Sequence, residues 1–324
     1  LKDPVEYRVM SGNISLRRAE ASLIEVESKE EFESIKGKKS FHSFVVDTPK
    51  NNNGNADNKI VNVALVGNPN CGKTTLYNRV SRSNEHVGNY SGVTISSKTA
   101  SISYKGYDVR FTDLPGTYSL SAYSEEEVIV RDHINNEKPD IVVNVVDASH
   151  LERHLYLTTQ LIDMGIQVVL ALNMYDDLEE KGDQLDIAHL GKLIGIPIVP
   201  TISKRGKGIF KLLNRIIKVV EDREPVIRHT HINYGSEMEV SIGKIEDKLK
   251  VFPNLSDAYH LRLLAIKSLE KDDYSLHILS ELEGFEEIQQ IVNDEIYRLE
   301  SLYGNDCETI ISNARYAFIS GALK

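Results

Sequence analysis

Short apolar runs alternate with segments of helical periodicity along residues 59–223. The runs end at or just before Gly, Asn, Asp or Pro, as buried strands do. Six strands are expected: Ile60–Val66, Ile95–Tyr104, Tyr107–Thr112, Asp140–Val146, Gln167–Leu172 and Pro197–Pro200. Helices are expected at Thr74–Ser83, Glu125–Asn135, Leu151–Met164, Ile187–Ile194 and Ile209–Val220. This alternation predicts an α/β fold, a mostly parallel six-stranded sheet with helices on both faces.

The second and third of these strands are joined by a tight turn at Lys105-Gly106. A turn this short joins antiparallel neighbours, because parallel strands need a long crossover. The second strand is therefore expected to run antiparallel in an otherwise parallel sheet.

Beyond Pro225 the strand pattern stops and only helical spacing of Ile, Leu, Val and Tyr continues. Helices are expected at Glu237–Lys250, Asp257–Leu269, Leu276–Leu282, Phe285–Tyr303 and Asp306–Leu323. Residues 224–324 are therefore expected to form a small all-α helical bundle. Its expected core includes Ile291, Ile296, Leu299 and Leu302.

A phosphate-binding pattern lies between the first strand and the first helix. Gly67-Asn68-Pro69-Asn70-Cys71-Gly72-Lys73-Thr74 fits G-x-x-x-x-G-K-[ST] at every fixed position. The glycines let backbone N–H groups surround a polyphosphate, Lys73 can neutralise the β- and γ-phosphates, and the Thr74 hydroxyl can ligate Mg²⁺. An ordinary Gly-rich turn has no need of the Lys-Thr pair. A nucleoside triphosphate is expected here, in contact with Gly67, Asn68, Pro69, Asn70, Cys71, Gly72, Lys73, Thr74 and Thr75.

Asn173-Met174-Tyr175-Asp176, directly after Val168–Leu172, predicts that the base is guanine. A carboxylate at a strand end can accept hydrogen bonds from both N1–H and the exocyclic amine of guanine, a donor pair that adenine lacks. The second residue of this N-K-x-D element is Lys in most GTPases, and Met174 here offers an apolar stem without charge. Asn173, Met174 and Asp176 are therefore expected to contact the nucleotide, although an isolated N-x-x-D is also found as a helix cap.

Three further elements follow the order of a GTPase. Asp113 in Asp113-Leu114-Pro115-Gly116 is expected to hold Mg²⁺ through water, while the N–H of Gly116 faces the γ-phosphate. Thr94, in the loop before the second strand, is expected to supply the second Mg²⁺ hydroxyl. The loop 201–205 is expected to place backbone groups of Thr201, Ile202 and Ser203 at the guanine O6. Together the elements predict Mg²⁺-dependent hydrolysis of GTP to GDP and phosphate, with Lys73, Thr94 and Gly116 in catalytic roles.

With these residues in view, the chain resembles the G domain of the bacterial ferrous-iron transport protein B (FeoB) family over residues 59–324. The resemblance rests on Gly67-Asn68-Pro69-Asn70, Val87-Gly88-Asn89-Tyr90-Ser91-Gly92-Val93-Thr94, Asp113-Leu114-Pro115-Gly116-Thr117-Tyr118-Ser119-Leu120 and Asn173-Met174-Tyr175-Asp176. Most regulatory GTPases place Gln directly after D-x-x-G to orient the attacking water. Thr117 stands there in this chain, as in this family, so the water must be positioned by other groups.

The resemblance implies a membrane part beyond Lys324 that moves ferrous iron, so that the chain would lie on the cytoplasmic face of the bacterial inner membrane and couple the GTP/GDP switch to Fe²⁺ uptake. GTPases with Asn at the position of Asn70, members of this family included, can use a potassium ion beside the phosphates, held partly by that Asn carbonyl. Asn70 is therefore a further expected catalytic residue and K⁺ a second expected ion; the alternative is that Asn70 merely caps the loop. The alternative is a soluble regulatory GTPase, for instance in ribosome assembly.

The N-terminus carries a second, shorter resemblance. Asp3–Met10, a turn at Ser11–Asn13 and Ile14–Ile24 look like the closing strands and short helix of FeoA, the small SH3-like partner of the same transport system. The chain would then come from a fusion of the two, with a β-rich remnant at residues 1–28 and a flexible, polar linker at residues 29–58. An unrelated β-hairpin attached to a GTPase is the alternative.

Composition narrows the possible partners. The chain has 324 residues and a net charge of −10, and residues 236–324 hold 17 acidic and 9 basic residues, a net charge of −8. Proteins that bind nucleic acid concentrate Lys and Arg instead, so no nucleic-acid partner is expected. Cys71 and Cys307 make no metal or disulfide pattern, and Cys71 is expected to be a small buried side chain. No apolar run is long enough to span a bilayer, so this piece is expected to be soluble.

Two other groups have ligand-like spacing. His150 and His154 lie i, i+4 near the start of a helix, but a third ligand is not evident and a solvated face is the preferred interpretation. Glu283-Gly284-Phe285-Glu286 has the spacing of some iron sites, and an acidic first helical turn accounts for it because the helix dipole favours Glu there. The sequence identifies no iron-binding residue, and it leaves open whether the chain forms a homo-oligomer.

Overall fold

The computed structural model describes residues 59–81, 85–89, 96–121, 124–226, 232–252, 255 and 259–324, together with two N-terminal strands, 5–9 and 12–16. The chain divides into two compact units, Leu1–Val46 and Asp47–Lys324. In the first unit, β1 (Val5–Val9) and β2 (Gly12–Leu16) pair antiparallel, with Val9 opposite Gly12. Two strands were expected there; the short helix expected after them lies outside the described residues.

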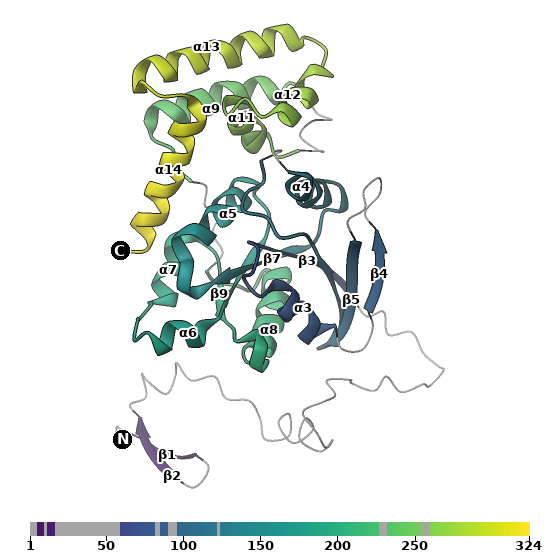
Figure 1. The fold of residues 1–324 in the computed structure, drawn as a ribbon, viewed down its shortest axis with the longest axis vertical. Helices are drawn as coiled ribbons and strands as arrows, with labels where there is room; N and C mark the ends of the chain where they lie inside the picture. The colour runs from purple at the N-terminus through teal and green to yellow at the C-terminus, as the bar shows by residue number, and fades with distance from the viewer. Residues whose placement is uncertain are drawn as a thin grey trace. The chain divides into compact units, whose positions relative to one another are not determined.

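The second unit is built on a mixed sheet (Figure 1). Its strands are β3 (Lys59–Gly67), β4 (Glu85–Asn89), β5 (Ser96–Tyr104), β6 (Tyr107–Asp113), β7 (Ile141–Asp147), β8 (Val168–Asn173) and β9 (Ile198–Pro200). They lie side by side in the order β4-β5-β6-β3-β7-β8-β9. β5 pairs antiparallel with both β4 and β6, and the other pairs are parallel. The predicted hairpin at Lys105-Gly106 is confirmed.

All six expected strands are present, and β4 is a seventh that the apolar pattern did not predict. Its sequence, Glu-His-Val-Gly-Asn, has a single large apolar residue. An edge strand needs only one partner, and β4 obtains it from β5, where Asn89 lies opposite Ser96. The pairing depends on tertiary position rather than on local propensity.

Helices cover both faces of the sheet, as predicted. They are α3 (Lys73–Val80), α4 (Glu125–Glu137), α5 (Leu151–Asp163), α6 (Tyr175–Glu180), α7 (Ile187–Ile194) and α8 (Ile209–Val220). α4 begins where the Ser124 hydroxyl accepts a hydrogen bond from the N–H of Glu127, followed by three glutamates that the helix dipole favours. α6 was not expected, because its six residues are too few to show a period.

Strand residues alternate between two buried cores. Val63 and Leu65 pack with α3 and α8, whereas Ala64 and Val66 pack on the opposite face with α4 and α5. Strands buried on both faces read as continuous apolar runs, which is why the sequence predicted them well.

The predicted helical bundle is present. It consists of α9 (Ser236–Leu249), α11 (Leu261–Leu269), α12 (Asp273–Ser280), α13 (Phe285–Tyr303) and α14 (Cys307–Ala322). Of its predicted core, Ile296 and Leu299 are buried and Ile291 is partly buried against them. Leu302 is 56% exposed, so its assignment to the core was wrong: it lies near the C-terminus of α13, on a face that no other described element covers.

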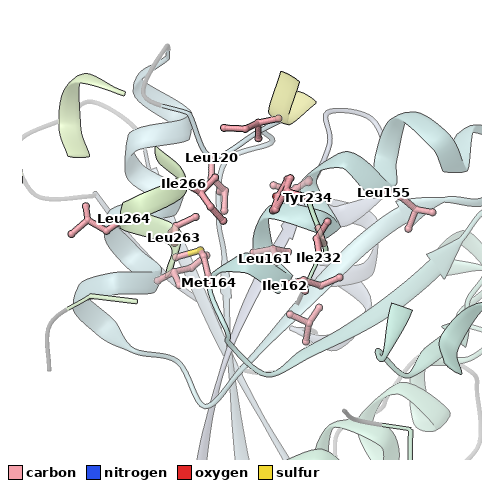
Figure 2. Packing of buried hydrophobic residues seen from close by; sticks show 14 of the residues in the cluster. Leu120, Leu155, Leu161, Ile162, Met164, Ile232, Tyr234, Leu263, Leu264 and Ile266 are labelled. Atoms are coloured by element: carbon pink, nitrogen blue, oxygen red, sulfur yellow. The ribbon is translucent and has the colours of Figure 1, made fainter. Parts of the chain in front are cut away.

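One hydrophobic core runs from the sheet into the bundle. Figure 2 shows Met164, which follows α5, close to Leu263 of α11, and Ile162 of α5 close to Ile232, all within one buried cluster. α14 leaves the bundle and packs along α5 as far as α7 (Figure 1). The sheet and the bundle therefore share one buried core. No helix among the described residues is long and apolar enough to cross a membrane.

Candidate functional site

The predicted site residues meet at one edge of the sheet. β3, β6, β7 and β8 end there at Gly67, Asp113, Asp147 and Asn173. Leu65 pairs with Asp113, and Asp147 pairs with Asn173. Ligands of open α/β sheets bind outside the carboxyl ends of the strands, so the topology gathers these side chains at the expected edge.

The phosphate-binding loop has a backbone that requires its glycines. Gly72 has φ 87°, and a Cβ there would lie 2.2 Å from the Asn173 Nδ2. A Cβ on Gly67 would lie 2.5 Å from the carbonyl oxygen of Val145. Asn70 also has a positive φ, 66°, which Asn tolerates better than most residues. The tight backbone of this loop is therefore compatible only with glycine at positions 67 and 72.

Lys73 and Asp113 form a buried ion pair in this loop. Lys73 is 8% exposed and Asp113 is 9% exposed. The residue expected to neutralise phosphate and the residue expected to act on Mg²⁺ are thus in direct contact. Thr74 follows in the first turn of α3 and is exposed, and Thr75 is half-buried.

The D-x-x-G element lies against the phosphate-binding loop. The N–H of Thr117 donates to the Gly67 carbonyl at 3.1 Å, and a Cβ on Gly116 would lie 3.3 Å from Pro69 Cα. Thr117 is buried, and its hydroxyl donates to the carbonyl of Ser119 at 2.6 Å. Its hydroxyl therefore stabilises the turn after Gly116.

Asn173 connects the phosphate-binding loop to the loop after β9. Its Nδ2 donates to the Cys71 carbonyl at 2.9 Å. Its Oδ1 accepts from the N–H of Ser203 at 3.0 Å, from the Ser203 hydroxyl at 2.8 Å and from the Thr201 hydroxyl at 3.3 Å. The amide is 2% exposed and fully engaged inside the protein, so any role it has in binding acts through the two loops it joins.

Met174 and Asp176 lie at the start of α6. Met174 has a left-handed backbone, φ 56°, and its Cε lies 3.6 Å from the point where a Gly72 Cβ would be. Asp176 lies in the first turn of α6, and its side chain is 20% exposed. Arg205 Nη2 lies 3.8 Å from its carboxylate. The carboxylate remains accessible to a base that packs beside Met174.

The loop after β9 continues into η2 (Ser203–Arg205), a 3-10 helix. The side chains of Thr201 and Ser203 bond to Asn173, and Ile202 is buried. Arg79 of α3 donates to the carbonyls of Ser203, at 3.0 Å, and Lys204. Arg79 was not singled out from the sequence, since an Arg at the end of a helix has no distinctive pattern.

Two other residues of the loop are buried. Cys71 is 1% exposed, and burial raises the pKa of its thiol to about 11; the expected small buried side chain is confirmed. Asn68 is 2% exposed, and neither its Oδ1 nor its Nδ2 has a hydrogen-bond partner in the described structure. Thr94 lies outside the described residues.

Comparison with known proteins identifies the family. The model for ferrous iron transport protein B matches residues 61–216, and the model for the FeoB cytosolic helical domain matches residues 234–324. Solved structures of NFeoB from S. thermophilus superpose closely: one mutant bound to mGDP is 34% identical, covers 82% of this chain and 98% of that chain, and has a TM-score of 0.74. The chain belongs to the ferrous iron transport protein B family.

Two further members extend the comparison. NFeoB from S. thermophilus bound to GDP.AlF4- and K⁺ is 34% identical, covers 81% of this chain and 99% of that chain, and has a TM-score of 0.69. A relative from Porphyromonas gingivalis, described as a "Fe(2+) transport protein A/Fe(2+) transporter FeoB fusion protein", is 39% identical over 100% of this chain and 41% of its own length. The chain spans about two fifths of that FeoB relative.

The structure places the two histidines with ligand-like spacing in different surroundings. His154 is 6% exposed and its Nδ1 accepts from the N–H of Asp147, so the solvated face expected for it was wrong; β7 and α5 bury it. His150 is exposed, as expected, and lies 3.0 Å from the Asp147 carboxylate. Across the described part of this FeoB chain, no cluster of three or more His, Cys, Asp or Glu side chains is arranged to hold a metal ion.

Proposed function

We propose that this chain binds and hydrolyses GTP as the nucleotide-dependent part of a ferrous-iron transporter. The observation that carries the proposal is that four residues lie at the same sheet edge: Lys73 after β3, Asp113 and Gly116 at and after the end of β6, and Asp176 after β8. The first three suit a triphosphate and the last suits guanine. The helical bundle contacts the segment after Gly116, because Lys267 of α11 donates a hydrogen bond to the Ser121 hydroxyl at 3.1 Å.

The phosphates are stabilised by Lys73 and by the backbone N–H groups of residues 70–74. When the nucleotide binds, the Lys73 ammonium leaves the carboxylate of Asp113 and pairs with the β- and γ-phosphates. It is therefore paired both with and without nucleotide. Loss of the γ-phosphate removes a partner from the N–H of Gly116, which lies against Pro69. The segment after Gly116 therefore relaxes upon hydrolysis.

The oxygen donors at the site fit Mg²⁺. Thr74 presents a hydroxyl and Asp113 a carboxylate, hard ligands of the kind Mg²⁺ prefers, and Mg²⁺ keeps several waters, so contact through water is expected for Asp113. Thr94 is proposed as the second hydroxyl. Bound Mg²⁺ supplies neutralisation of charge on the phosphate oxygens.

Asp176 tests the base assignment. Asp176→Asn replaces an acceptor with a donor, which suits the C2 carbonyl of xanthine. We therefore expect the variant to prefer XTP, whereas the wild type prefers GTP. Titration of both nucleotides against wild type and variant measures this. A variant that still prefers GTP would show that Asp176 does not contact the base.

Asn70 is proposed to hold K⁺ beside the phosphates, where a monovalent cation offsets charge that develops between the β- and γ-phosphates. Asn70 is exposed at the loop, and the related protein from S. thermophilus has been solved with K⁺ and GDP.AlF4-. We expect faster phosphate release in K⁺ than in Na⁺ at equal ionic strength. Asn70→Ala should abolish the difference with little change in GDP affinity, and a variant that still distinguishes the ions contradicts the assignment.

The transport role is proposed from the relatives, which are named Fe(2+) transporters and are longer than this chain. The part of the protein that they contain in addition would cross the inner membrane, and residues 1–28 would be the end of a FeoA-like domain. Family membership does not favour the alternative of a regulatory GTPase in ribosome assembly. Fe²⁺ uptake by cells that express the complete protein, with Lys73→Ala as the variant, tests the role: uptake unaffected by Lys73→Ala would contradict coupling to GTP.

A further inference from the structure

Arg79 joins the helix of the phosphate-binding loop to the loop after β9. Its Nε donates to the Ser203 carbonyl at 3.0 Å, and its Nη2 donates to the Lys204 carbonyl. Arg79 lies in the last turn of α3, whose first residue is Lys73. Hydrogen bonds from a charged guanidinium to two adjacent carbonyls leave the peptide between them little freedom to rotate.

The Ser203 carbonyl and the Lys204 N–H belong to one peptide unit. In a trans peptide these groups point in opposite directions, so the donor that fixes the carbonyl also fixes the direction of the N–H. The N–H groups of Ile202, Ser203 and Arg205 already donate to acceptors within the protein at 2.9–3.1 Å. The N–H of Lys204 has no acceptor among the described residues and points away from Arg79.

We propose that Arg79 is a positioning residue for guanine recognition, which holds the Ser203–Lys204 peptide so that the Lys204 N–H faces the O6 carbonyl of the base. This inference rests on the proposed binding of GTP. The positive charge on Arg79 also polarises the peptide, which strengthens its N–H as a donor. Asn173 holds the preceding peptide of the same loop, because its Oδ1 accepts from the N–H and the hydroxyl of Ser203, so the loop is held on both sides of the Ser203 Cα.

Different groups of the protein then recognise different atoms of guanine. Asp176 accepts from N1–H and the 2-amino group, and the Lys204 N–H donates to O6. Inosine triphosphate lacks only the 2-amino group, and 6-thio-GTP replaces O6 with sulfur, a weaker acceptor. The two analogues therefore report separately on Asp176 and on the peptide held by Arg79.

The experiment compares GTP, ITP and 6-thio-GTP affinities of wild type, Arg79→Met and Arg79→Lys. Arg79→Met should reduce the preference for GTP over 6-thio-GTP about fivefold, the loss of one hydrogen bond, and leave the preference for GTP over ITP within about twofold. Arg79→Lys keeps the charge but cannot hold both carbonyls, so it should lose part of the same preference. Hydrolysis at saturating GTP should stay within about twofold, which separates a positioning role from loss of folding.

Arg110→Met is the matched control, because Arg110 is 51% exposed on β6 and its Nε bonds to Asp108. It should leave both preferences unchanged. An unchanged preference for GTP over 6-thio-GTP in both Arg79 variants, or an equal change in both preferences, overturns the inference. Failure of the wild type to prefer GTP over ATP would instead contradict the proposed function.

Discussion

Replacing Arg315, which connects α14 to α5, by Met should lower the free energy of unfolding more than replacing any exposed residue. Arg315 has no exposed side-chain surface, and its guanidinium contacts Asp163 at 3.3 Å, Glu270 at 2.6 Å and the Tyr234 hydroxyl at 3.0 Å. The Tyr234 hydroxyl donates to Asp163 at 2.5 Å, and Lys267 lies 2.6 Å from Glu270. One cation thus compensates buried carboxylates from two different helices.

The size of this loss follows from the carboxylates that Arg315→Met leaves without a cation. After Arg315→Met, Glu270 keeps Lys267, but the Asp163 carboxylate remains buried with only a tyrosine hydroxyl. Removing one partner of a buried ion pair costs about 3–5 kcal/mol, so we expect the free energy of unfolding to fall by about 4 kcal/mol. Adding Asp163→Asn removes the unpaired charge and should recover about half of this loss.

The loss should depend on pH. Burial raises the pKa of Asp163 above its ordinary value although Arg315 opposes the shift, so removal of Arg315 raises that pKa further. A carboxyl whose pKa is higher in the folded than in the unfolded protein takes up a proton on folding. Its contribution to the free energy of unfolding is therefore lost as pH rises through the folded pKa. The deficit of Arg315→Met should therefore be smaller at pH 5 than at pH 8.

Urea unfolding followed by circular dichroism at both pH values measures the effect. Arg223→Met is the control: Arg223 is 70% exposed and pairs with Glu221 at 3.3 Å, so it should cost less than about 1 kcal/mol. A deficit below about 1 kcal/mol for Arg315→Met, or one that is equal at both pH values and unrelieved by Asp163→Asn, would refute the reasoning.

Three other outcomes are expected. Burial opposes ionisation of Glu295, but hydrogen bonds, of which that from Lys244 is the strongest, lower its pKa to about 2. Glu295→Gln should therefore lower the free energy of unfolding by up to about 3 kcal/mol above pH 4.5 and by progressively less toward pH 2. Urea unfolding measures this loss. Gly72→Ala should weaken GDP binding at least about tenfold by titration, because the added Cβ would lie 2.2 Å from an amide nitrogen, whereas Gly182→Ala, with open space around it, should not. Thr94→Ala should impair GTP turnover far more than GDP affinity, and equal losses would contradict its assignment to Mg²⁺.

The fold was largely predictable because its strands are buried on both faces. Continuous runs such as Val168–Leu172 have only one stable solution, a strand inside a covered sheet. β4 and α6 escaped prediction because each is short and packs against a neighbour: β4 pairs with β5, and α6 lies against the 3-10 turn Ala148–His150. The exposure of Leu302 was missed because helical spacing shows that residues share a face without showing which face is covered.

The sequence by itself determined the chemistry of this protein. The positions of Lys73, Asp113 and Asp176 relative to strand ends require those side chains to lie at one sheet edge, since the parallel strands share a direction. The tertiary structure alone decided how that edge is held together. The bonds from Arg79 to η2 and from Arg315 to Asp163 join segments far apart in the chain, and such contacts leave no local period or spacing in the sequence because they depend on packing between whole elements.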